Sequence, residues 1–207
     1  MKKGFFISVE GVDGAGKSSH LPVMQDYLEN NGYKVITTRE PGGTIIGEKI
    51  RDLLLYTDIE IDRMTELYLL FASRQELIKN IILPNLEHGV CVLIDRFTDS
   101  SLAYQGYGRE IGVAKVEQII SLLEPCLKPD LTLVFDVDLD TAAKRLAKNN
   151  KKDRMEKESR EFFVKVQNAY HQIAKNEPKR VKIINTSQEK DQTRAEIKNY
   201  LAKLIGK

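Results

Sequence analysis

Short apolar runs alternate with longer amphipathic stretches along most of the chain. Five runs have the length of buried strands, at residues 5–9, 34–38, 90–94, 131–136 and 181–184. Between them, apolar residues recur at helical spacing over residues 17–30, 46–55, 63–87, 112–123, 139–149, 155–175 and 190–205. Strands that alternate with helices predict an α/β fold, with a five-stranded parallel sheet covered by helices on both faces.

This order of elements also predicts where a ligand binds. In open parallel sheets, ligands bind at the carboxyl ends of the strands, where the loops cluster. Glycine-rich and charged stretches follow the runs at 5–9, 34–38 and 90–94. We therefore expect these stretches to meet in one crevice.

The overall composition narrows the classes of function. With 207 residues, 42% hydrophobic and 30% charged, residues 1–207 are expected to form one globular domain with its own core. A net charge of +2 is too close to neutral to indicate a nucleic-acid partner. No apolar segment is long enough to cross a bilayer, so no membrane partner is expected. Cys91 and Cys126 lack metal or redox spacing, which favours a reducing cytoplasm.

The stretch from Gly11 to Ser18 has the phosphate-binding pattern of glycine, four free positions, glycine, lysine and serine. It joins a predicted strand to a predicted helix N-terminus, where free N–H groups and the helix dipole favour a bound phosphate. Lys17 is expected to reach the β- and γ-phosphates of a nucleotide, and the Ser18 hydroxyl to hold Mg²⁺. The predicted nucleotide-binding residues here are Gly11, Val12, Asp13, Gly14, Ala15, Gly16, Lys17, Ser18 and Ser19.

Two further loops follow strands. The loop at residues 38–44 combines Arg39 with Pro-Gly-Gly turn chemistry, and Thr44 is placed to cap the next helix. On that helix, Arg51 is either a solvated charge or a ligand-facing cation. The third strand ends at Asp95-Arg96. Beside a phosphate-binding loop, such an aspartate favours a Mg²⁺ role over a plain strand-end acid.

Two segments are ambiguous from their pattern alone. Residues 100–109 are polar and aromatic, which suits either recognition of a base or a capped loop. Residues 144–160 mix basic and acidic side chains, which describes either a solvated helix or a lid that closes on phosphates. The pair Asn149-Asn150 interrupts the helical pattern and favours the lid, which contains Arg154.

The cations indicate the kind of phosphoryl acceptor. An alcohol acceptor generally benefits from a positioned base. A nucleoside monophosphate already carries an anionic oxygen, because its second pKa is about 6. Its difficulty is the approach of two polyanions, which Mg²⁺ and the fixed cations Lys17, Arg51, Arg96 and Arg154 would relieve. This inventory favours a nucleotide kinase.

Six motifs in this order resemble the bacterial thymidylate kinase family. They are residues 10–18, 38–44, Phe71-Ala-Ser-Arg74, Asp95-Arg96-Phe97, Ser100-Ser-Leu-Ala-Tyr-Gln105 and Asp153-Arg-Met-Glu156. The resemblance spans nearly the whole chain, and its most specific parts are residues 39–44 and the pair of motifs at 95–96 and 103–105. It implies a P-loop NTPase type of fold and Mg²⁺-dependent transfer of the γ-phosphate of ATP to dTMP, giving dTDP and ADP for dTTP synthesis. It also implies a homodimer that pairs through long helices such as 63–88.

The resemblance implies roles for residues near the phosphates. Asp13 matches an acidic residue that meets the sugar 3′-hydroxyl, and Arg145 matches one that flanks adenine. Arg154 matches a lid arginine that stabilises charge on the transferred group. Together with the phosphate-binding pattern and the strand-end acid, this gives Lys17, Asp95, Arg96 and Arg154 as the expected catalytic residues and Ser18 and Asp95 as the expected metal ligands.

The resemblance also implies how the acceptor nucleotide is held. Phe71 matches the aromatic that stacks on thymine, Arg74 the residue that bonds its carbonyl, and Tyr104 the side chain that would crowd a ribose 2′-hydroxyl. The implied dTMP-binding set is Asp13, Arg39, Arg51, Phe71, Arg74, Arg96, Ser101, Tyr104 and Gln105. In many members the stacking aromatic stands four residues before the arginine, a place held here by Leu70.

Two rival functions are considered. A GTP-dependent switch would need a guanine-reading Asn-Lys-x-Asp motif after a late strand, and residues 185–191 do not supply it. Another small P-loop kinase would act on a nucleoside or on a different monophosphate. A panel of acceptors separates this second rival from a thymidylate kinase.

Overall fold

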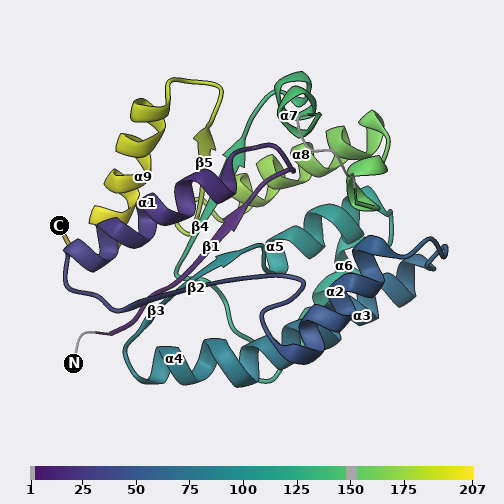
Figure 1. Ribbon diagram of the computed structural model, residues 1–207, viewed down its shortest axis with the longest axis horizontal. Coiled ribbons are helices and arrows are strands. Elements are labelled where there is room, and N and C mark those ends of the chain that lie inside the picture. The colour runs from purple at the N-terminus through teal and green to yellow at the C-terminus, as the bar shows by residue number, and fades with distance from the viewer. Residues whose placement is uncertain (1–2, 148–152) are drawn as a thin grey trace.

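The structure, a computed structural model, describes residues 3–147 and 153–207. Its centre is a five-stranded sheet in the order β2-β3-β1-β4-β5, in which every pair of neighbours is parallel (Figure 1). The strands are β1 (Phe6–Glu10), β2 (Val35–Arg39), β3 (Cys91–Asp95), β4 (Leu131–Asp136) and β5 (Val181–Asn185). Each strand begins and ends within a residue of its predicted run, so the predicted α/β fold is confirmed.

The helices occur in the predicted order with one addition: residues 98–108, for which a base-reading segment or a capped loop was expected, are also helical. They are α1 (Lys17–Asn30), α2 (Ile45–Tyr56), α3 (Arg63–Leu77), α4 (Leu83–Glu87), α5 (Thr98–Ser101), α6 (Val113–Ile120), α7 (Leu139–Leu146), α8 (Arg160–Asn176) and α9 (Lys190–Leu204). Two π-helical segments, η1 (Ile78–Ile82) and η2 (Leu102–Gly108), and a 3₁₀ turn, η3 (Met155–Lys157), complete the described elements.

Two helix boundaries differ from the predictions for physical reasons. The helix predicted at 63–87 is one helical path whose middle, η1, widens to π geometry between α3 and α4. The helix predicted at 155–175 begins only at Arg160, because the Ser159 hydroxyl accepts the Phe162 N–H at 3.2 Å and caps α8. Asn149-Asn150 and the lysines at 148, 151 and 152 lie outside the described residues.

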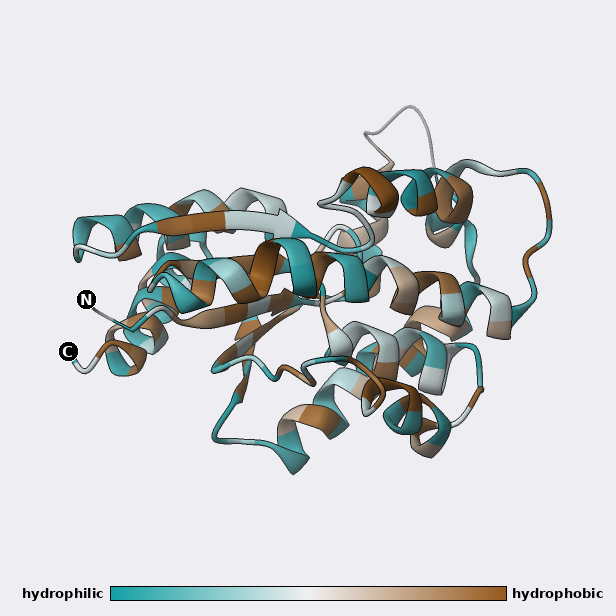
Figure 2. Cartoon of the chain, turned by 90° about the horizontal axis from the view of Figure 1, so that it is seen from below, coloured by the Kyte–Doolittle hydropathy of each residue, from teal (hydrophilic) through white to brown (hydrophobic). Residues whose placement is uncertain are grey.

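Helices cover both faces of the sheet. On one face, Ile7 and Val9 of β1 belong to the same buried cluster as Met24 of α1. On the other face, Phe6 joins a cluster with Leu67 of α3. Because successive strand residues point to opposite faces, a strand covered on both sides needs a continuous apolar run. Hydrophobic residues, brown in Figure 2, accordingly mark the strands in the middle of the molecule.

The two cysteines lie in different environments. Cys91 is buried and Cys126 exposed, and both are free thiols. The Cys91 sulfur accepts the Phe5 N–H at 3.4 Å, so this cysteine is part of the sheet's packing. Among the described helices, none combines the length and the apolar character needed to cross a membrane.

The strand order determines which loops meet. In the parallel register, Val9 of β1 and Arg39 of β2 both lie opposite Asp95 of β3. The glycine-rich loop after β1 therefore adjoins the Asp95-Arg96 turn, and the 40–44 loop lies on the far side of that turn. These three loops frame the crevice that the sequence predicts.

Candidate active site

The loop between β1 and α1 requires glycine at two closely packed positions. Gly11 and Gly14 have positive φ angles of 129° and 80°. A Cβ at Gly11 would lie 2.4 Å from the Phe135 carbonyl oxygen, and one at Gly14 would lie 2.5 Å from that of Ala142. Among the described residues, no side chain caps the first turn of α1. Its N–H groups are therefore available to an anion.

Asp13 links the two cations nearest this loop. Its Oδ1 accepts a hydrogen bond from Arg96 Nη2 at 2.7 Å and lies 3.7 Å from Lys17 Nζ. Burial alone would raise the pKa of Asp13, but Arg96 and Lys17 outweigh it and hold that pKa at about 2. Lys17 Nζ also donates to the carbonyls of Gly11 and Val12. Asp13 is thus ionised at neutral pH and oriented by the cations.

Arg96 is held in an unusual backbone conformation. Its φ angle of 71° is rare for a residue with a side chain. The guanidinium donates to Tyr104 Oη at 3.1 Å and to Ser100 Oγ at 3.3 Å, and it lies 4.7 Å from the centre of the Tyr104 ring. Such strain persists where the surroundings over-determine the conformation, and it is frequent at functional sites.

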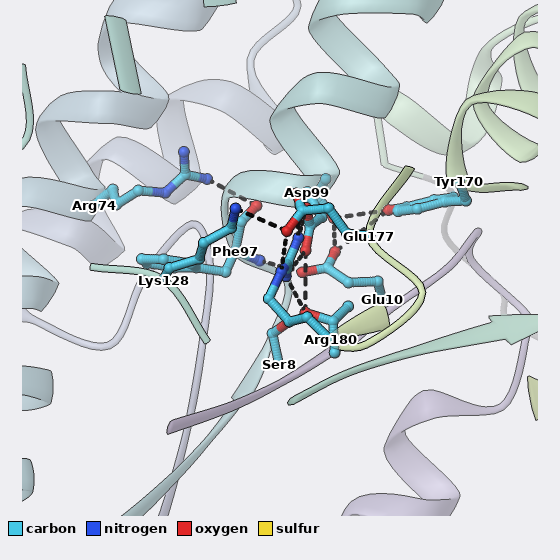
Figure 3. A network of polar contacts seen from close by, with 11 residues as sticks. Ser8, Glu10, Arg74, Phe97, Asp99, Lys128, Tyr170, Glu177 and Arg180 are labelled. Atoms are coloured by element: carbon cyan, nitrogen blue, oxygen red, sulfur yellow. Dashed lines mark hydrogen bonds and ion pairs between the residues drawn. The ribbon is translucent and has the colours of Figure 1, made fainter. Parts of the chain in front are cut away.

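Glu10 is the group that determines this turn, and sequence reasoning gave it no role. Its buried carboxylate accepts the Phe97 N–H at 2.8 Å and the Ser100 hydroxyl (Figure 3). Tyr170 of α8 donates to the same carboxylate at 3.4 Å. Burial, with a contribution from Asp99, raises the pKa of Glu10 to about 7. The available signal was an acid at the end of a fully apolar strand, where burial is unusual without partners.

A pocket opens beside Asp13 and Arg96, between the glycine-rich loop, α2, α3 and η2. Arg51 of α2 reaches it and donates to the Pro41 carbonyl at 2.9 Å. The predicted Thr44 cap is confirmed, since its Oγ1 accepts the Gly47 N–H at 2.9 Å and begins α2. The predicted site residues that line this pocket are Asp13, Arg51, Arg74, Arg96, Ser101, Tyr104, Gln105 and Arg154.

Two rows of side chains, each with a spacing of four residues, pack against each other in the wall of the pocket. Glu66, Leu70 and Arg74 follow one another along α3, and Ser101 and Gln105 lie on the facing α5–η2 segment. Arg74 Nη2 donates to Ser101 Oγ at 3.0 Å, and Gln105 Nε2 donates to Glu66 Oε1 at 2.9 Å. These two hydrogen bonds fix the distance between α3 and the α5–η2 segment.

Arg74 carries an open hydrogen-bond donor. It forms a buried ion pair with Glu40 at 2.6 Å. Within the described part of the chain, Arg74 Nη1 and Glu40 Oε1 are buried without a hydrogen-bond partner. Because buried polar atoms are normally bonded, these atoms mark a place for a polar ligand atom.

Two members of the implied acceptor set lie outside the pocket wall. Phe71 is buried in the core, and the Arg74 guanidinium lies 4.6 Å from its ring centre. Leu70, one residue earlier on the helix, lines the pocket instead. The expectation that Phe71 faces a base is therefore not met. Arg39 is exposed and pairs with Glu48 at 3.0 Å, beside a second depression that Ser18 and Asp95 also line.

Comparison with known proteins decides the family. The family model described as thymidylate kinase matches residues 9–197. The chain belongs to the thymidylate kinase family. It is 46% identical over 202 residues to a thymidylate kinase of Ruthia magnifica, covering 97% of this chain and 98% of that protein. It is 44% identical over 203 residues to one of Bordetella pertussis, covering 98% and 97%. A crystal structure of thymidylate kinase from Ehrlichia chaffeensis superposes with a TM-score of 0.80 at 32% identity, covering 96% of this chain and 98% of that one.

In this member of the thymidylate kinase family, the predicted ligands of the metal are Ser18 and Asp95. Asp95 Oδ1 is buried and, among the described residues, accepts no hydrogen bond. Ser18 and Asp95 line one depression. No group of three or more His, Cys, Asp or Glu side chains is gathered for a metal in the described parts of the chain. One carboxylate and one hydroxyl fit Mg²⁺, which prefers few protein ligands together with water and phosphate oxygens.

Arg145 bonds the glycine-rich loop, and Arg154 bonds the wall of the pocket. Arg145 of α7 donates to the carbonyls of Gly14 and Thr186 at 3.1 and 3.0 Å, joining the glycine-rich loop to the loop after β5. Arg154 lines the pocket beside Asp13 and Arg96, where its Nε donates to the Leu54 carbonyl at 2.7 Å and its Nη2 pairs with Glu66 at 2.6 Å. The roles expected for Arg145 beside adenine and for Arg154 beside the transferred group stay predictions, and sequence reasoning gave no role to Glu66, which holds Arg154.

Proposed function

We propose that this chain is a dTMP kinase that transfers the γ-phosphate of ATP to dTMP with the help of Mg²⁺. The observation that carries the proposal is the convergence of Arg51, Arg96 and Asp13 on one pocket, with Lys17 3.7 Å from Asp13. Cations from several elements suit a reaction between two polyanions. The relatives named above carry this activity in their names.

The acceptor side of the reaction needs no general base. The dTMP phosphate brings its own anionic oxygen. Arg96, fixed by Asp13, and Arg51, fixed by the Pro41 carbonyl, hold that phosphate in place. Asp13, with a pKa of about 2, stays ionised to accept a hydrogen bond from the sugar 3′-hydroxyl.

The donor side rests on the loop after β1. The N–H groups at the start of α1 and the Lys17 ammonium bind the ATP phosphates, and Arg145 borders the adenine. Mg²⁺, held by Ser18 and Asp95, would supply charge neutralisation between the β- and γ-phosphates. Arg154 adds a cation beside the transferred group. The segment 144–160 is proposed to act as the lid of this single kinase domain.

We propose a homodimer that pairs through α2 and α3. These helices pack together and leave Ile45, Leu53 and Tyr68 exposed, at 82%, 44% and 58% of their surface. An apolar face of this kind suits an interface. Sedimentation of the unmodified chain and of Tyr68→Lys tests the dimer, which this substitution should dissociate.

We also propose that the chain works in a reducing cytoplasm, which two free thiols suit.

An acceptor panel tests the activity. ADP formation from ATP and Mg²⁺ is measured with dTMP, dUMP, UMP, AMP and thymidine. We expect the highest kcat/KM for dTMP. Turnover of thymidine without turnover of dTMP would identify a nucleoside kinase, and preference for AMP or UMP would identify a different monophosphate kinase.

A further inference from the structure

Glu66 occupies a special place in the pocket wall. It is only 1% exposed, yet no ligand role falls to it in the proposed reaction. Its Oε1 accepts from Gln105 Nε2 at 2.9 Å and from Arg109 Nε at 3.3 Å. Its Oε2 accepts from Arg154 Nη2 at 2.6 Å and from Arg109 Nη2 at 3.2 Å. One buried carboxylate thus joins three side chains from two other parts of the chain.

The charge state of Glu66 decides how Gln105 is oriented. Burial by itself raises the pKa of Glu66, but Arg109, Gln105 and Arg154 outweigh it and leave the pKa lowered. An ionised carboxylate only accepts hydrogen bonds. Gln105 must therefore turn its NH₂ group toward Glu66, and its carbonyl oxygen points away from that carboxylate. Since Gln105 lines the pocket, we infer that this oxygen is the group offered to a ligand.

The wall then presents a defined order of polar groups. Arg74 Nη1 is a buried donor without a partner among the described residues, and Gln105 Oε1 is an acceptor one turn along the facing wall. The thymine edge carries the O4 acceptor beside the N3–H donor and complements this order. Cytosine carries an N4 donor beside the N3 acceptor and opposes it at both positions. A Gln105 amide flipped by 180° would remove the mismatch at N3.

We propose that Glu66 is a positioning residue that makes the pocket select thymine over cytosine by fixing the orientation of the Gln105 amide. The inference rests on the proposed function, since it assumes that the acceptor's base lies against this wall. Rejection of cytosine follows because its N3 would face the Gln105 oxygen, leaving two acceptors opposed in a buried site. Glu66 acts through Gln105 and makes no contact with the base in this scheme.

The variant Glu66→Gln tests this directly. Arg154 and Arg109 donate to Oε2 at 2.6 and 3.2 Å, and only the longer Arg109 Nε contact of 3.3 Å shares Oε1 with Gln105, so the single amide oxygen of a glutamine should remain on the Oε2 side. Its NH₂ group would then face Gln105 and force that amide to turn. We measure dissociation constants of dTMP and dCMP by calorimetry and expect the preference for dTMP to fall at least about tenfold, the worth of one misplaced buried hydrogen bond.

A double-mutant cycle separates positioning from a structural role. In a Gln105→Ala background, Glu66→Gln should change the dTMP/dCMP ratio by less than about twofold, because the group it orients is absent. The matched control is Glu158→Gln, which removes the other acid on Arg109 at 2.6 Å but leaves the Glu66–Gln105 bond intact. We expect this control to keep the unmodified ratio.

Two outcomes would overturn the inference. One is equal loss of dTMP and dCMP affinity in Glu66→Gln, which is the signature of a purely structural role. The other is a full effect of Glu66→Gln in the Gln105→Ala background. If Glu66→Gln does not fold, Glu66→Asp keeps the charge, withdraws the carboxylate from Gln105 and should show the same fall. Turnover of dTMP by the unmodified chain is measured in parallel; its absence overturns the proposed function, while the binding ratios still decide the role of Glu66.

Discussion

Asp13 and Arg96 join two loops that are far apart in the chain: Arg96 Nη2 donates to Asp13 Oδ1 at 2.7 Å. The contact ties the turn after β3 to the loop after β1. It also keeps Asp13 ionised, with a pKa of about 2. Because both residues line the same pocket, the pair fixes the direction of a guanidinium and of a carboxylate at the same point.

Arg96→Ala should weaken use of the acceptor far more than use of the donor. The change removes a cation that is proposed to bind the acceptor phosphate and frees Asp13, so we expect the KM for dTMP to rise at least about tenfold, as charge-assisted hydrogen bonds are worth about 1.5–3 kcal/mol. The KM for ATP should change by less than about threefold. Initial rates with each substrate varied in turn provide the measurement. A dTMP response like that of the unmodified chain would remove Arg96 from the acceptor site.

Glu10 predicts a specific pH dependence of stability. Its pKa is about 7 in the folded chain and 4.5 as an ordinary value. Between these values the unfolded chain loses the proton and the folded chain keeps it, so this group lowers the free energy of unfolding as pH rises from 4.5 to 7. The loss is on the order of 3 kcal/mol and is complete above the folded pKa.

Urea unfolding of Glu10→Gln against the unmodified chain tests this dependence. We expect the free energy of unfolding of Glu10→Gln, relative to the unmodified chain, to rise between about pH 5 and about pH 8. The matched control is Glu87→Gln at an exposed position, for which the difference should stay flat. A flat difference for Glu10→Gln as well would mean that Glu10 is not buried in its protonated form.

The sequence predicted those features that depend on local pattern. Strand ends came from apolar runs, and the Thr44 cap came from turn chemistry, because neighbouring residues determine both. The loop from Gly11 to Ser18 was predictable because glycine, lysine and serine spacing directly reflects a backbone that curls around an anion. The alternation of strands and helices predicted a parallel sheet, but not the order of its strands.

The rest depended on packing between distant segments. Glu10, Glu40 and Glu66 each gain their role from partners that the chain brings in from elsewhere, such as Phe97, Arg74 and Gln105. The misplaced aromatic shows a different limit. Both Leu70 and Phe71 continue the apolar stripe of α3, and only the docked helix shows which one faces the pocket. The sequence held one hint: Leu70 stands four residues before Arg74, and side chains with that spacing lie on the same face of a helix.

Asp95→Asn should raise the concentration of Mg²⁺ required for activity. Asp95 Oδ1 is buried without a hydrogen-bond partner among the described residues, and an amide is a weaker ligand for a hard cation than a carboxylate. We expect half-maximal activity at about tenfold higher Mg²⁺ or more, with little change in the KM for dTMP. Titration of activity with Mg²⁺ at saturating substrates is the measurement. An unaltered Mg²⁺ requirement would exclude Asp95 as a ligand.

The ion pair between Asp99 and Arg180 lies in the same polar network as Glu10 (Figure 3). Arg180 donates to both Asp99 oxygens, at 2.6 and 2.9 Å, and also pairs with Glu177 at 2.9 Å. Asp99 is 2% exposed and adjoins Ser100, which holds Glu10. The pair therefore anchors the short α5 helix to the start of β5.

Arg180→Met should destabilise the chain by about 3–5 kcal/mol, because it leaves the Asp99 charge buried without its partner. Adding Asp99→Asn removes that charge and should recover much of the loss. The matched control is Arg194→Met, which breaks an exposed pair with Asp191 of 3.0 Å and should cost about 0–1 kcal/mol. Urea unfolding at neutral pH compares all three variants. Equal losses for Arg180→Met and Arg194→Met would show that the buried pair does not anchor α5, since only an anchoring contact exceeds the surface value.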